Sequence, residues 1–192
     1  RREILKRVAI QLFSQQGFDS TTTFEIAKAA DVTEPVIYYH FKNKDGLFTA
    51  ILIDIFKEYF IRFDSLNENP TQQFDRIENL INFHFDFVDK FPDETYIITS
   101  ACPAKLRNSA HICAREIEQQ RNALTYYISD SLEKGIDNGE FHVVPVNATT
   151  GLILAMVNGL LRRRALKLDN IKGLKTETVE FCRRSLVRDI HK

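Results

Sequence analysis

Residues 21–48 read TTTFEIAKAADVTEPVIYYHFKNKDGLF, and this stretch decides the fold that we expect. Thr22 and Glu25 have the spacing of a capping box, in which each side chain accepts a hydrogen bond from a free backbone N–H at the start of a helix. A short helix through Ile26 follows. Asp31 then stands at the turn, because Asp tolerates the left-handed backbone conformation. The stretch therefore predicts a short helix that ends in a tight turn.

A second short helix begins directly after this turn. Thr33 is a residue type that caps helices, and Pro35 falls in the first turn, where a helix needs no backbone N–H. Two short helices joined by a tight turn form a helix-turn-helix, which binds DNA in many proteins but also occurs in bundles that bind nothing. The pattern alone therefore leaves DNA binding and simple packing equally open.

The segments on either side extend the helical pattern. Apolar residues recur with the period of an amphipathic helix from Arg2 to Gln15, and Gly17 stands where that helix would end. Asn43 can cap a fourth helix, whose apolar side chains run from Leu47 to Phe60. Four more helices are expected over residues 74–88, 105–134, 147–166 and 174–190, and a short segment is expected over residues 93–101. The chain therefore predicts about nine helices, no strand and an all-α fold.

The composition agrees with a helical protein and excludes several classes. The 192 residues include only 7 Gly and 5 Pro, which is too few for the many tight turns of a β-sandwich or barrel. Lys and Arg number 26 and Asp and Glu also number 26, so a uniformly basic coat for nucleic acid is excluded, whereas a local basic patch is not. The longest charge-free run, Phe141 to Leu161, contains Pro, Gly and Asn, so no membrane span is expected.

Residues for metal binding or catalysis are not arranged in any known motif. The three cysteines, at positions 102, 113 and 182, lack the close spacing of a zinc site, and their odd number argues against a disulfide framework. His84 and Asp86 lie in the sequence FHFDF, but on a helix they point in different directions. Phosphate-binding loops and nucleophile motifs are missing. We therefore expect a cytoplasmic protein with no catalytic residue, no metal and no cofactor.

The stretch quoted above, together with Leu12-Phe13 and Gly17-Phe18, resembles the DNA-binding signature of the TetR family of transcriptional regulators. The resemblance covers residues 4–53, about a quarter of the chain. Two features depart from the family pattern. Asp31 replaces the usual Gly of the turn, and residues 1–48 hold seven basic and six acidic residues, which is a weak net charge for a DNA-binding segment.

The resemblance implies two domains and a function. Residues 1–48 would form a three-helix helix-turn-helix domain, and residues 49–192 a larger helical domain that binds an effector and dimerises. The expected protein is a homodimeric regulator of double-stranded DNA, most simply a repressor that a small apolar effector releases from a palindromic operator. The alternative is a helical enzyme or carrier that acts on an apolar small molecule.

The second helix of such a motif lies in the major groove, led by its N-terminal residues. Thr33 can bond a base edge or a phosphate. Glu34 can accept a hydrogen bond from the amine of cytosine, and Pro35 and Val36 can touch thymine methyl groups. The resemblance adds DNA contacts, mainly to phosphates, by Thr22 or Thr23, Tyr38, Tyr39, His40 and Lys44. Tyr38 or Tyr39 can instead pack as a core aromatic, and the expected core residues are Ile26, Ala27, Val32, Ile37, Phe41 and Leu47.

The C-terminal half carries the expected dimer interface and effector site. The helix over 147–166 has two apolar stripes, one for the core and one for a partner, although a larger monomer core would fit as well. The last helix has an apolar face that we expect at the interface, made of Val179, Cys182, Leu186 and Ile190. Similar proteins line an effector cavity with the helices that here carry the residues Phe56, Phe60, Phe63, Phe83, Phe87, Tyr96, Tyr126, Tyr127 and Met156, each of which can also be simple core.

Overall fold

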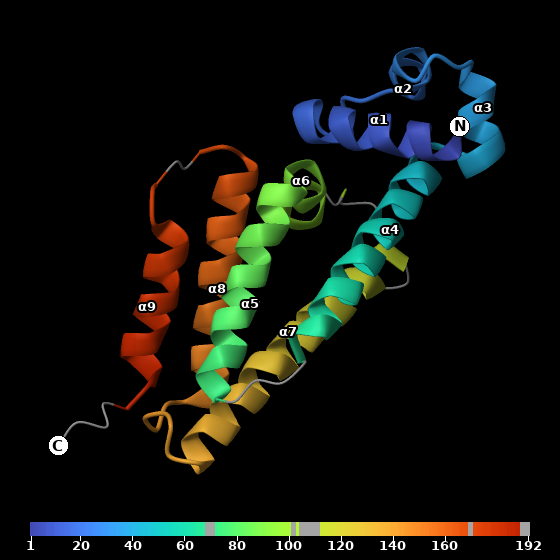
Figure 1. Cartoon of the computed structure of the whole chain (residues 1–192). Coiled ribbons are helices and arrows are strands. Elements are labelled where there is room, and N and C mark those ends of the chain that lie inside the picture. Colours follow the sequence, from blue (N-terminus) through green and yellow to red (C-terminus); the bar gives the residue numbers. More distant parts are fainter. Residues whose placement is uncertain (68–71, 101–102, 104–111, 169–170, 189–192) are drawn as a thin grey trace. The chain divides into compact units, whose positions relative to one another are not determined.

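The computed structural model describes residues 1–67, 72–100, 103, 112–168 and 171–188 (Figure 1). Within these ranges the chain is helical and forms no strand, so the expected all-α fold is confirmed. The elements are α1 (Arg2–Gln16), α2 (Thr23–Ala29), α3 (Glu34–Phe41), α4 (Lys44–Asp64), a 3-10 turn (Ser65–Asn67), α5 (Gln73–Lys90), α6 (Pro92–Ser100), α7 (Ile112–Asp137), α8 (Val146–Ala165) and α9 (Leu174–Leu186). No helix of this part of the chain is long and apolar enough to span a membrane.

The chain divides into two compact units. The first comprises Arg1–Tyr59 and Phe91–Gln119, and the second comprises Phe60–Lys90 and Gln120–Lys192. The long helices α4 and α7 each contribute residues to both units. We describe each unit by itself.

The first unit is built around a cluster of three aromatic rings. Phe13 of α1, Phe18 of the following connection and Phe48 of α4 are buried, with ring centroids 5.2 to 5.7 Å apart. At the other end of α1, the buried ammonium of Lys6 pairs with Asp54 of α4 and, at 2.6 Å, with Glu3. The aromatic cluster and this ion pair fix α1 across the start of α4.

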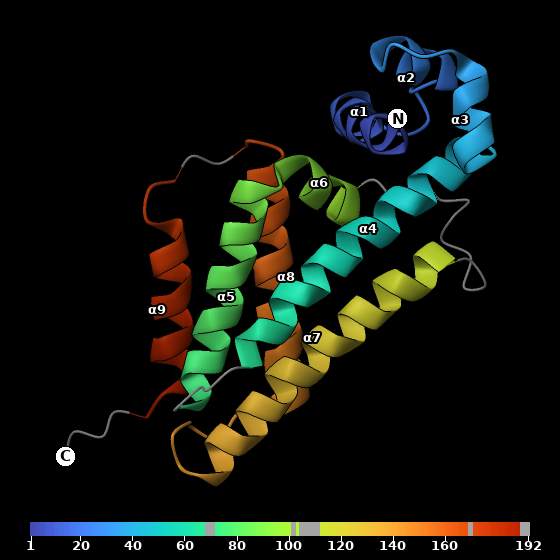
Figure 2. The same cartoon turned by 45° about the vertical axis from the view of Figure 1, so that its right-hand side comes forward.

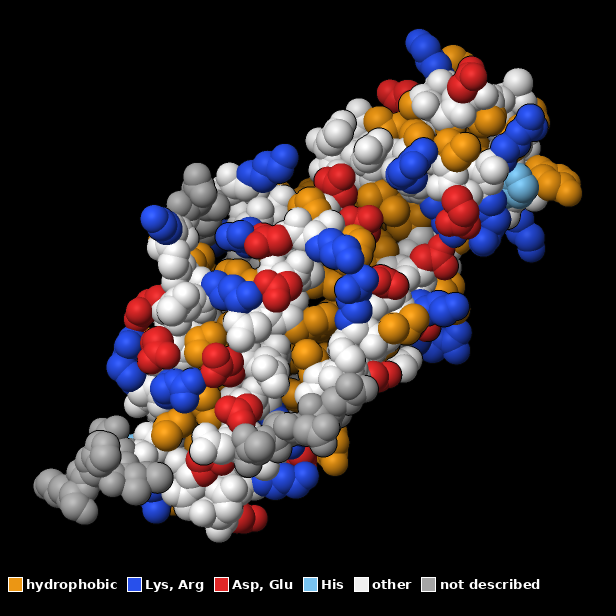
Figure 3. Space-filling model, in the orientation of Figure 1, with side chains coloured by type: hydrophobic (Ala, Val, Ile, Leu, Met, Phe, Trp, Pro, Cys, Tyr) orange, Lys and Arg blue, Asp and Glu red, His pale blue; other side chains and the backbone are white. Residues whose placement is uncertain are grey.

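The second unit is organised by α5, which contacts both α8 and α9 (Figures 1 and 2). Its apolar face is strongly one-sided, as the helical period predicts, and it buries eight side chains. Ion pairs join the charged flank of α5 to both neighbours. Arg164 of α8 binds Asp89 with two nitrogens, and Arg183 of α9 binds Glu78 at 2.7 Å. Acidic and basic side chains are correspondingly interspersed on the face shown in Figure 3.

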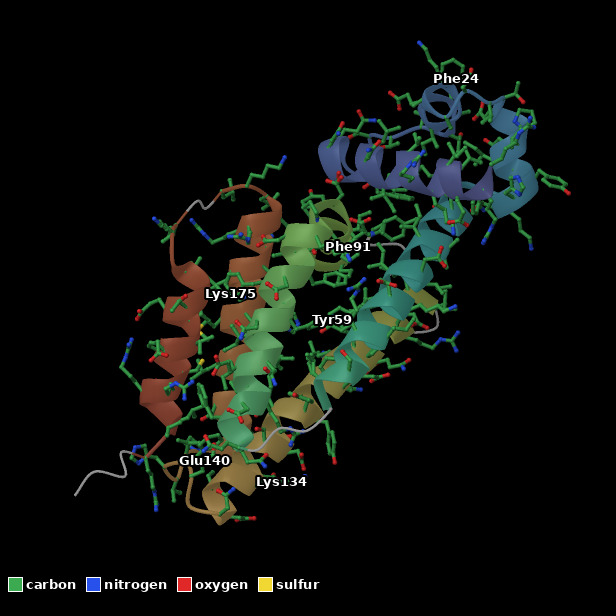
Figure 4. All side chains as sticks on the ribbon, in the orientation of Figure 1. Phe24, Tyr59, Phe91, Lys134, Glu140 and Lys175 are labelled. Atoms are coloured by element: carbon green, nitrogen blue, oxygen red, sulfur yellow. The ribbon has the colours of Figure 1, made fainter. Side chains whose placement is uncertain are left out.

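The N-terminus of α5 is capped from a distant part of the sequence. The carboxylate of Glu140 accepts hydrogen bonds from the backbone N–H groups of Gln73, at 2.8 Å, and Phe74, at 2.7 Å. A carboxylate suits this position because the first N–H groups of a helix are unpaired and carry its positive dipole end. Figure 4 shows Glu140 and Lys134 at the same end of this unit, where α7 finishes.

The apolar face of α9 corrects one expectation. Val179, Cys182 and Leu186 are buried within the second unit, on the side of α9 that meets α5, so they do not face a partner. Ile190, the fourth residue of that face, lies outside the described residues. The helix ends at Leu186, earlier than expected, because the following backbone is extended and pairs with residues 140–142. His142 N–H donates to Leu186 O at 2.8 Å, and Arg188 N–H donates to Glu140 O at 3.0 Å.

The two stripes of α8 separate as expected. Ile153, Val157 and Leu161 are buried in the second unit, whereas Leu152 is 71% exposed and Ala155 is exposed beside it. A stripe that belonged to a larger monomer core would be covered by the rest of the chain, whereas the stripe with Leu152 and Ala155 is exposed. The expected helix over 105–134 is present from Ile112 to Asp137, and its first part lies outside the described residues.

His84 of α5 makes the stability of the second unit depend on pH. Its ring is 4% exposed and its Nδ1 lies 2.8 Å from Leu80 O, so a neutral ring donates this bond. Burial lowers the pKa of His84 to about 4. Because the unfolded chain takes up the proton near pH 6.5, the unfolding free energy should fall by about 3 kcal/mol as the pH drops from 7 to 4.

Denaturant titrations between these pH values measure the effect. His84→Met removes the titrating group and should flatten the pH dependence in this window. His142→Gln, at an exposed position, is the control and should leave it as in the wild type. An equal pH dependence in wild type and His84→Met would show that this ring does not carry the effect.

Candidate nucleic-acid interface

The start of α2 has the capping box that the sequence predicts. Thr22 Oγ1 accepts from Glu25 N–H at 3.1 Å, and a Glu25 carboxylate oxygen accepts from Thr22 N–H at 2.8 Å. The hydrogen bond from the Thr22 backbone holds the pKa of Glu25 below its ordinary value. These bonds fix the first turn of α2 and leave the charge of Glu25 at its N-terminus.

The turn between α2 and α3 is also as expected. Asp31 has φ of 53°, in the left-handed region, and Val32 N–H donates to Ala27 O at 3.0 Å. Asp therefore supplies the conformation for which Gly is the usual residue. Behind the turn, the expected core residues are buried, with Val32 partly exposed at the edge: Ile26, Ala27, Ile37, Phe41 and Leu47. This core fixes α3 against α2.

The outward face of α3 collects most of the expected contact residues. Ile37 and Phe41 point into the core, so the intervening Tyr38 and Tyr39 point outward, and Tyr39 is 85% exposed. Neither tyrosine packs in the core. Thr33 and Pro35 are exposed as well, while Val36 and His40 are partly exposed. Thr33 occupies the N-cap position but its side chain makes no capping hydrogen bond, contrary to expectation.

Glu34, at the first position of α3, is held by two hydroxyl groups. Thr23 Oγ1 donates to Glu34 Oε1 at 2.5 Å, and the Tyr38 hydroxyl donates to the same oxygen at 3.3 Å. The other carboxylate oxygen accepts no hydrogen bond from the described residues. The side chain is therefore an oriented acceptor at the leading end of α3, with one oxygen left for a donor outside the protein.

The structure gives Lys44 partners inside the protein. Its ammonium donates to the carbonyl oxygens of Phe18 and Thr21, both at 2.8 Å, and lies 4.4 Å from the centroid of the Phe18 ring. The preceding Asn43 caps α4 as expected, because its Oδ1 accepts from Gly46 N–H at 2.7 Å. Exposed basic side chains elsewhere in this unit are Arg1, Arg2, Arg7, Lys28, Lys42, Lys57 and Arg115.

The sequence analysis did not include one exposed aromatic residue near the N-terminus of α2. Phe24, in the first turn of α2, is 62% exposed (Figure 4). It follows Thr23, whose hydroxyl reaches Glu34 on α3. An apolar ring at such a position is suited to a thymine methyl group. The helical period could have predicted that Phe24 is exposed, because Phe24 lies about 100° around α2 from the buried residues Ile26 and Ala27.

The aromatic residues expected around an effector fall in both units. Phe56, which is buried, and Tyr96, which is partly exposed, belong to the first unit. In the second unit Phe63 is the centre of a cluster, with ring centroids 5.2 Å from Tyr127, 6.3 Å from Phe83 and 6.5 Å from Phe60. Phe87 continues the cluster at 5.8 Å from Phe83. The structure thus brings five of these residues together.

Tyr126 and Tyr127 are neighbours in the sequence but differ in burial. Tyr126 is 70% exposed and points away from the cluster, whereas Tyr127 is buried. The Tyr127 hydroxyl is buried without a hydrogen-bond partner of good geometry among the described residues, although the Arg76 guanidinium lies over its ring, 4.6 Å from the centroid, and opposes the rise in the Tyr127 pKa that burial causes. A buried polar group left unpaired costs about 1–3 kcal/mol, so this hydroxyl is suited to an acceptor atom that a ligand would bring. Met156 of α8 is only partly buried.

Clusters that could hold a metal ion are not found in the described ranges. Cys113 and Cys182 are buried thiols. Burial raises the pKa of Cys182 to about 11, so it stays protonated and unreactive at neutral pH.

Comparison with known proteins places the N-terminal segment in a family. The family model of bacterial regulatory proteins, tetR family, matches residues 5–51. The HTH-type transcriptional regulator AcrR of Shigella flexneri is 56% identical over 50 residues, which are 26% of this chain and 23% of AcrR. The biofilm operon icaADBC HTH-type negative transcriptional regulator IcaR of Staphylococcus epidermidis is 30% identical over 130 residues, 67% of this chain and 65% of IcaR. The chain thus spans less than two thirds of each relative's length.

Solved structures agree over nearly the whole chain. A ketosteroid transcriptional regulator of Mycobacterium tuberculosis has a TM-score of 0.82 at 18% identity, covering 98% of this chain and 96% of its own. AibR, solved in complex with isovaleryl coenzyme A and operator DNA, has a TM-score of 0.75 at 16% identity, with 95% of each chain covered. At these identities the likeness shows a shared fold.

The two N-cap threonines should differ in their effect on stability. Thr22→Ala removes the hydroxyl that accepts from Glu25 N–H and should lower the unfolding free energy by about 1 kcal/mol. Thr33→Ala is the matched control, because its hydroxyl caps nothing, and it should have only a small effect. Denaturant unfolding of the two variants measures the difference, and equal losses would contradict this account of the caps.

Proposed function

The chain belongs to the TetR family of transcriptional regulators, and we propose that it is a ligand-responsive repressor that binds a near-palindromic operator as a homodimer in the cytoplasm. The observation that carries the proposal is the outward face of α3, where an oriented carboxylate and an exposed tyrosine stand on a helix fixed by a buried core. Residues 1–48 would bind DNA, and residues 49–192 would bind the effector and the partner subunit.

We propose that α3 lies in the major groove with its N-terminus leading. Glu34 would accept from the amine of cytosine, and Pro35 and Val36 would touch thymine methyl groups. Phosphates would be bound at the N-terminus of α2, by Thr22 or Thr23, and along α3 by Thr33, Tyr38, Tyr39 and His40. The exposure of Tyr39 and the free oxygen of Glu34 support these roles.

We propose that subunits pair through the exposed stripe of α8 and the outward side of α9. Leu152 and Ala155 on α8, and Phe181 on α9, are exposed apolar residues of the second unit. Gly151 and Gly159 stand on the same side of α8, where small residues allow a partner helix to approach closely. This replaces the face through Leu186, which is occupied by the protein's own core.

We propose an acyl thioester or a related amphipathic molecule as effector. Apolar rings around Phe63 would accept the acyl chain, and the unpaired hydroxyl of Tyr127 would donate to its carbonyl oxygen. The structural relative AibR, in complex with isovaleryl coenzyme A and operator DNA, supports this class. Binding would favour a position of α4 in which the two DNA-binding units cannot both dock.

Selection of binding sites from a random duplex library tests the DNA proposal. The wild type should select a near-palindrome. Glu34→Gln should change the preferred base at one position of each half-site, from cytosine toward adenine, by roughly 1–3 kcal/mol, because Gln also donates. Asp31→Asn is the control, since it removes the same charge at the turn and should leave the selected bases unchanged. Failure of the wild type to select any site would refute the proposal.

Leu152→Glu should convert dimers to monomers that remain folded, because the side chain is exposed in the single chain and its charge would be buried only in the dimer. Sedimentation measures the mass, and the helical circular dichroism signal reports the fold. Ile61→Glu, at an exposed apolar position of α4, should stay dimeric. A wild type that sediments as a monomer at micromolar concentration would contradict the proposed interface.

Isovaleryl-CoA should weaken binding to the selected operator by about tenfold, within the usual range of allosteric coupling, whereas free CoA should not. Tyr127→Phe removes only the hydroxyl, and it should raise the effector concentration needed roughly fivefold without lowering the melting temperature. Tyr126→Phe, at an exposed position, is the control. Fluorescence anisotropy of labelled operator measures both effects. Equal responses of the two variants would remove Tyr127 from the site.

A further inference from the structure

Arg76, near the start of α5, is a cation that the protein buries and pairs only in part. Its side chain is 11% exposed. A single nitrogen, Nη1, makes both of its hydrogen bonds, to Asp130 at 2.6 Å and to Gln73 Oε1 at 3.3 Å. Nε and Nη2 have no acceptor of good geometry among the described residues. One edge of the guanidinium therefore lacks acceptors, although burial keeps most water away from it.

The buried hydroxyl of Tyr127 belongs to the same place in the second unit. Arg76 Cζ lies 4.6 Å from the centroid of the Tyr127 ring, and the hydroxyl has no hydrogen-bond partner of good geometry. Arginine carries donors alone, so it cannot accept the phenolic hydrogen, whichever way the hydroxyl turns. Burial raises the pKa of Tyr127, so this hydrogen stays in place at neutral pH. Two donor groups therefore lie close together with hydrogens that the described residues do not pair.

The acidic partner of Arg76 is shared with a second cation. Asp130 also accepts from Lys134 at 2.9 Å, so one carboxylate serves two positive charges. Lys134 is 59% exposed and lies near the end of α7 (Figure 4). The carboxylate of Glu140, at the same end of α5, is used by backbone N–H groups of that helix. The charge of Arg76 is therefore neutralised only in part, which favours an oxygen atom with negative charge or partial charge beside it.

The rings that adjoin Tyr127 are apolar. The Phe63 centroid is 5.2 Å from that of Tyr127, and the Phe83 centroid is 6.3 Å from that of Phe63. Aromatic walls with a few fixed polar groups are typical of small-molecule sites. An apolar chain that ends in an oxygen acceptor would match the rings and the two donors at once.

We infer that Arg76 and Tyr127 together bind one acyl oxygen of the effector, which makes Arg76 a specificity-determining residue. The inference rests on the proposed effector site, to which Tyr127 alone was assigned. The phenolic hydroxyl and the unpaired edge of the guanidinium each donate to this oxygen, and a donor that carries charge makes the stronger bond. A thioester carbonyl and a carboxylate offer the same acceptor, so both are tested below.

Calorimetry without DNA tests the inference with two probes, isovaleryl-CoA and S-isopentyl-CoA. The second differs from the first only in a CH2 group in place of the carbonyl. The wild type should bind isovaleryl-CoA at least about tenfold more tightly, because the thioether leaves both donors unpaired. Arg76→Lys should reduce this preference to about threefold or less, because a compact ammonium cannot bind Asp130 and present a second edge to the ligand. Arg76→Gln should do the same and serves if Arg76→Lys does not fold.

The ratio of the two affinities separates recognition from a structural role. A variant that only loosens the second unit weakens both probes alike and keeps the preference of the wild type, and this outcome would overturn the inference. Lys134→Met is the matched control, because it removes the other cation bound to Asp130 and should keep the full preference. The double variant Arg76→Lys/Tyr127→Phe should lose less preference than the product of the two single losses, because both donors act on one oxygen. Losses that multiply would contradict a shared oxygen.

Isovalerate, as a third probe, shows which acyl compound the site prefers. Tighter binding of isovaleryl-CoA assigns a thioester, and tighter binding of isovalerate assigns a free acid. In either case Arg76→Lys should weaken the tighter ligand by about tenfold. Equal affinities of the wild type for isovaleryl-CoA and S-isopentyl-CoA would overturn the inference and leave the proposed effector class standing. If the wild type binds none of the three compounds, that class fails as well, whereas DNA binding keeps its own test.

Discussion

The N-termini of helices carry unpaired backbone N–H groups, and the side chains that accept hydrogen bonds from them fix several helices of this protein in place. Glu140 closes the start of α5 and so joins the connection after α7 to α5 within the second unit. Thr22 and Glu25 close α2, and Asn43 closes α4. The N-terminus of α3 has no side-chain cap. The helices α1, α8 and α9 likewise begin without a side-chain cap, whereas on α3 the first residue, Glu34, is oriented by the hydroxyl of Thr23.

Features encoded by neighbouring residues could be predicted from the sequence. The capping box of Thr22 and Glu25 and the left-handed turn at Asp31 depend on contacts within four residues, and both were found. The buried positions Ile26 and Ile37 follow from helical period, which sequence displays directly.

Features that depend on distant residues could not be predicted. The acceptors of Lys44 lie 23 and 26 residues earlier, and nothing in the local sequence distinguishes a lysine that binds carbonyls from one that binds phosphate. The same reason explains the error at α9. An apolar face is needed equally for a protein's own core and for a partner, so the pattern through Leu186 fitted both, and only the packing against α5 decided between them. The sequence of α8 shows two apolar stripes, but it does not indicate which of them is buried in the core of the single chain.

The weak charge of the N-terminal segment bears on how DNA would be recognised. Residues 1–48 hold seven basic and six acidic residues, and the ammonium of Lys44 is already engaged by carbonyl groups. A net charge this close to zero gives each DNA-binding segment little long-range attraction for DNA. Binding must then depend on base contacts along α3 and on two units docking together. Such a protein is sensitive to geometry, because a shift of one unit removes half of the base contacts and little compensating electrostatic attraction remains.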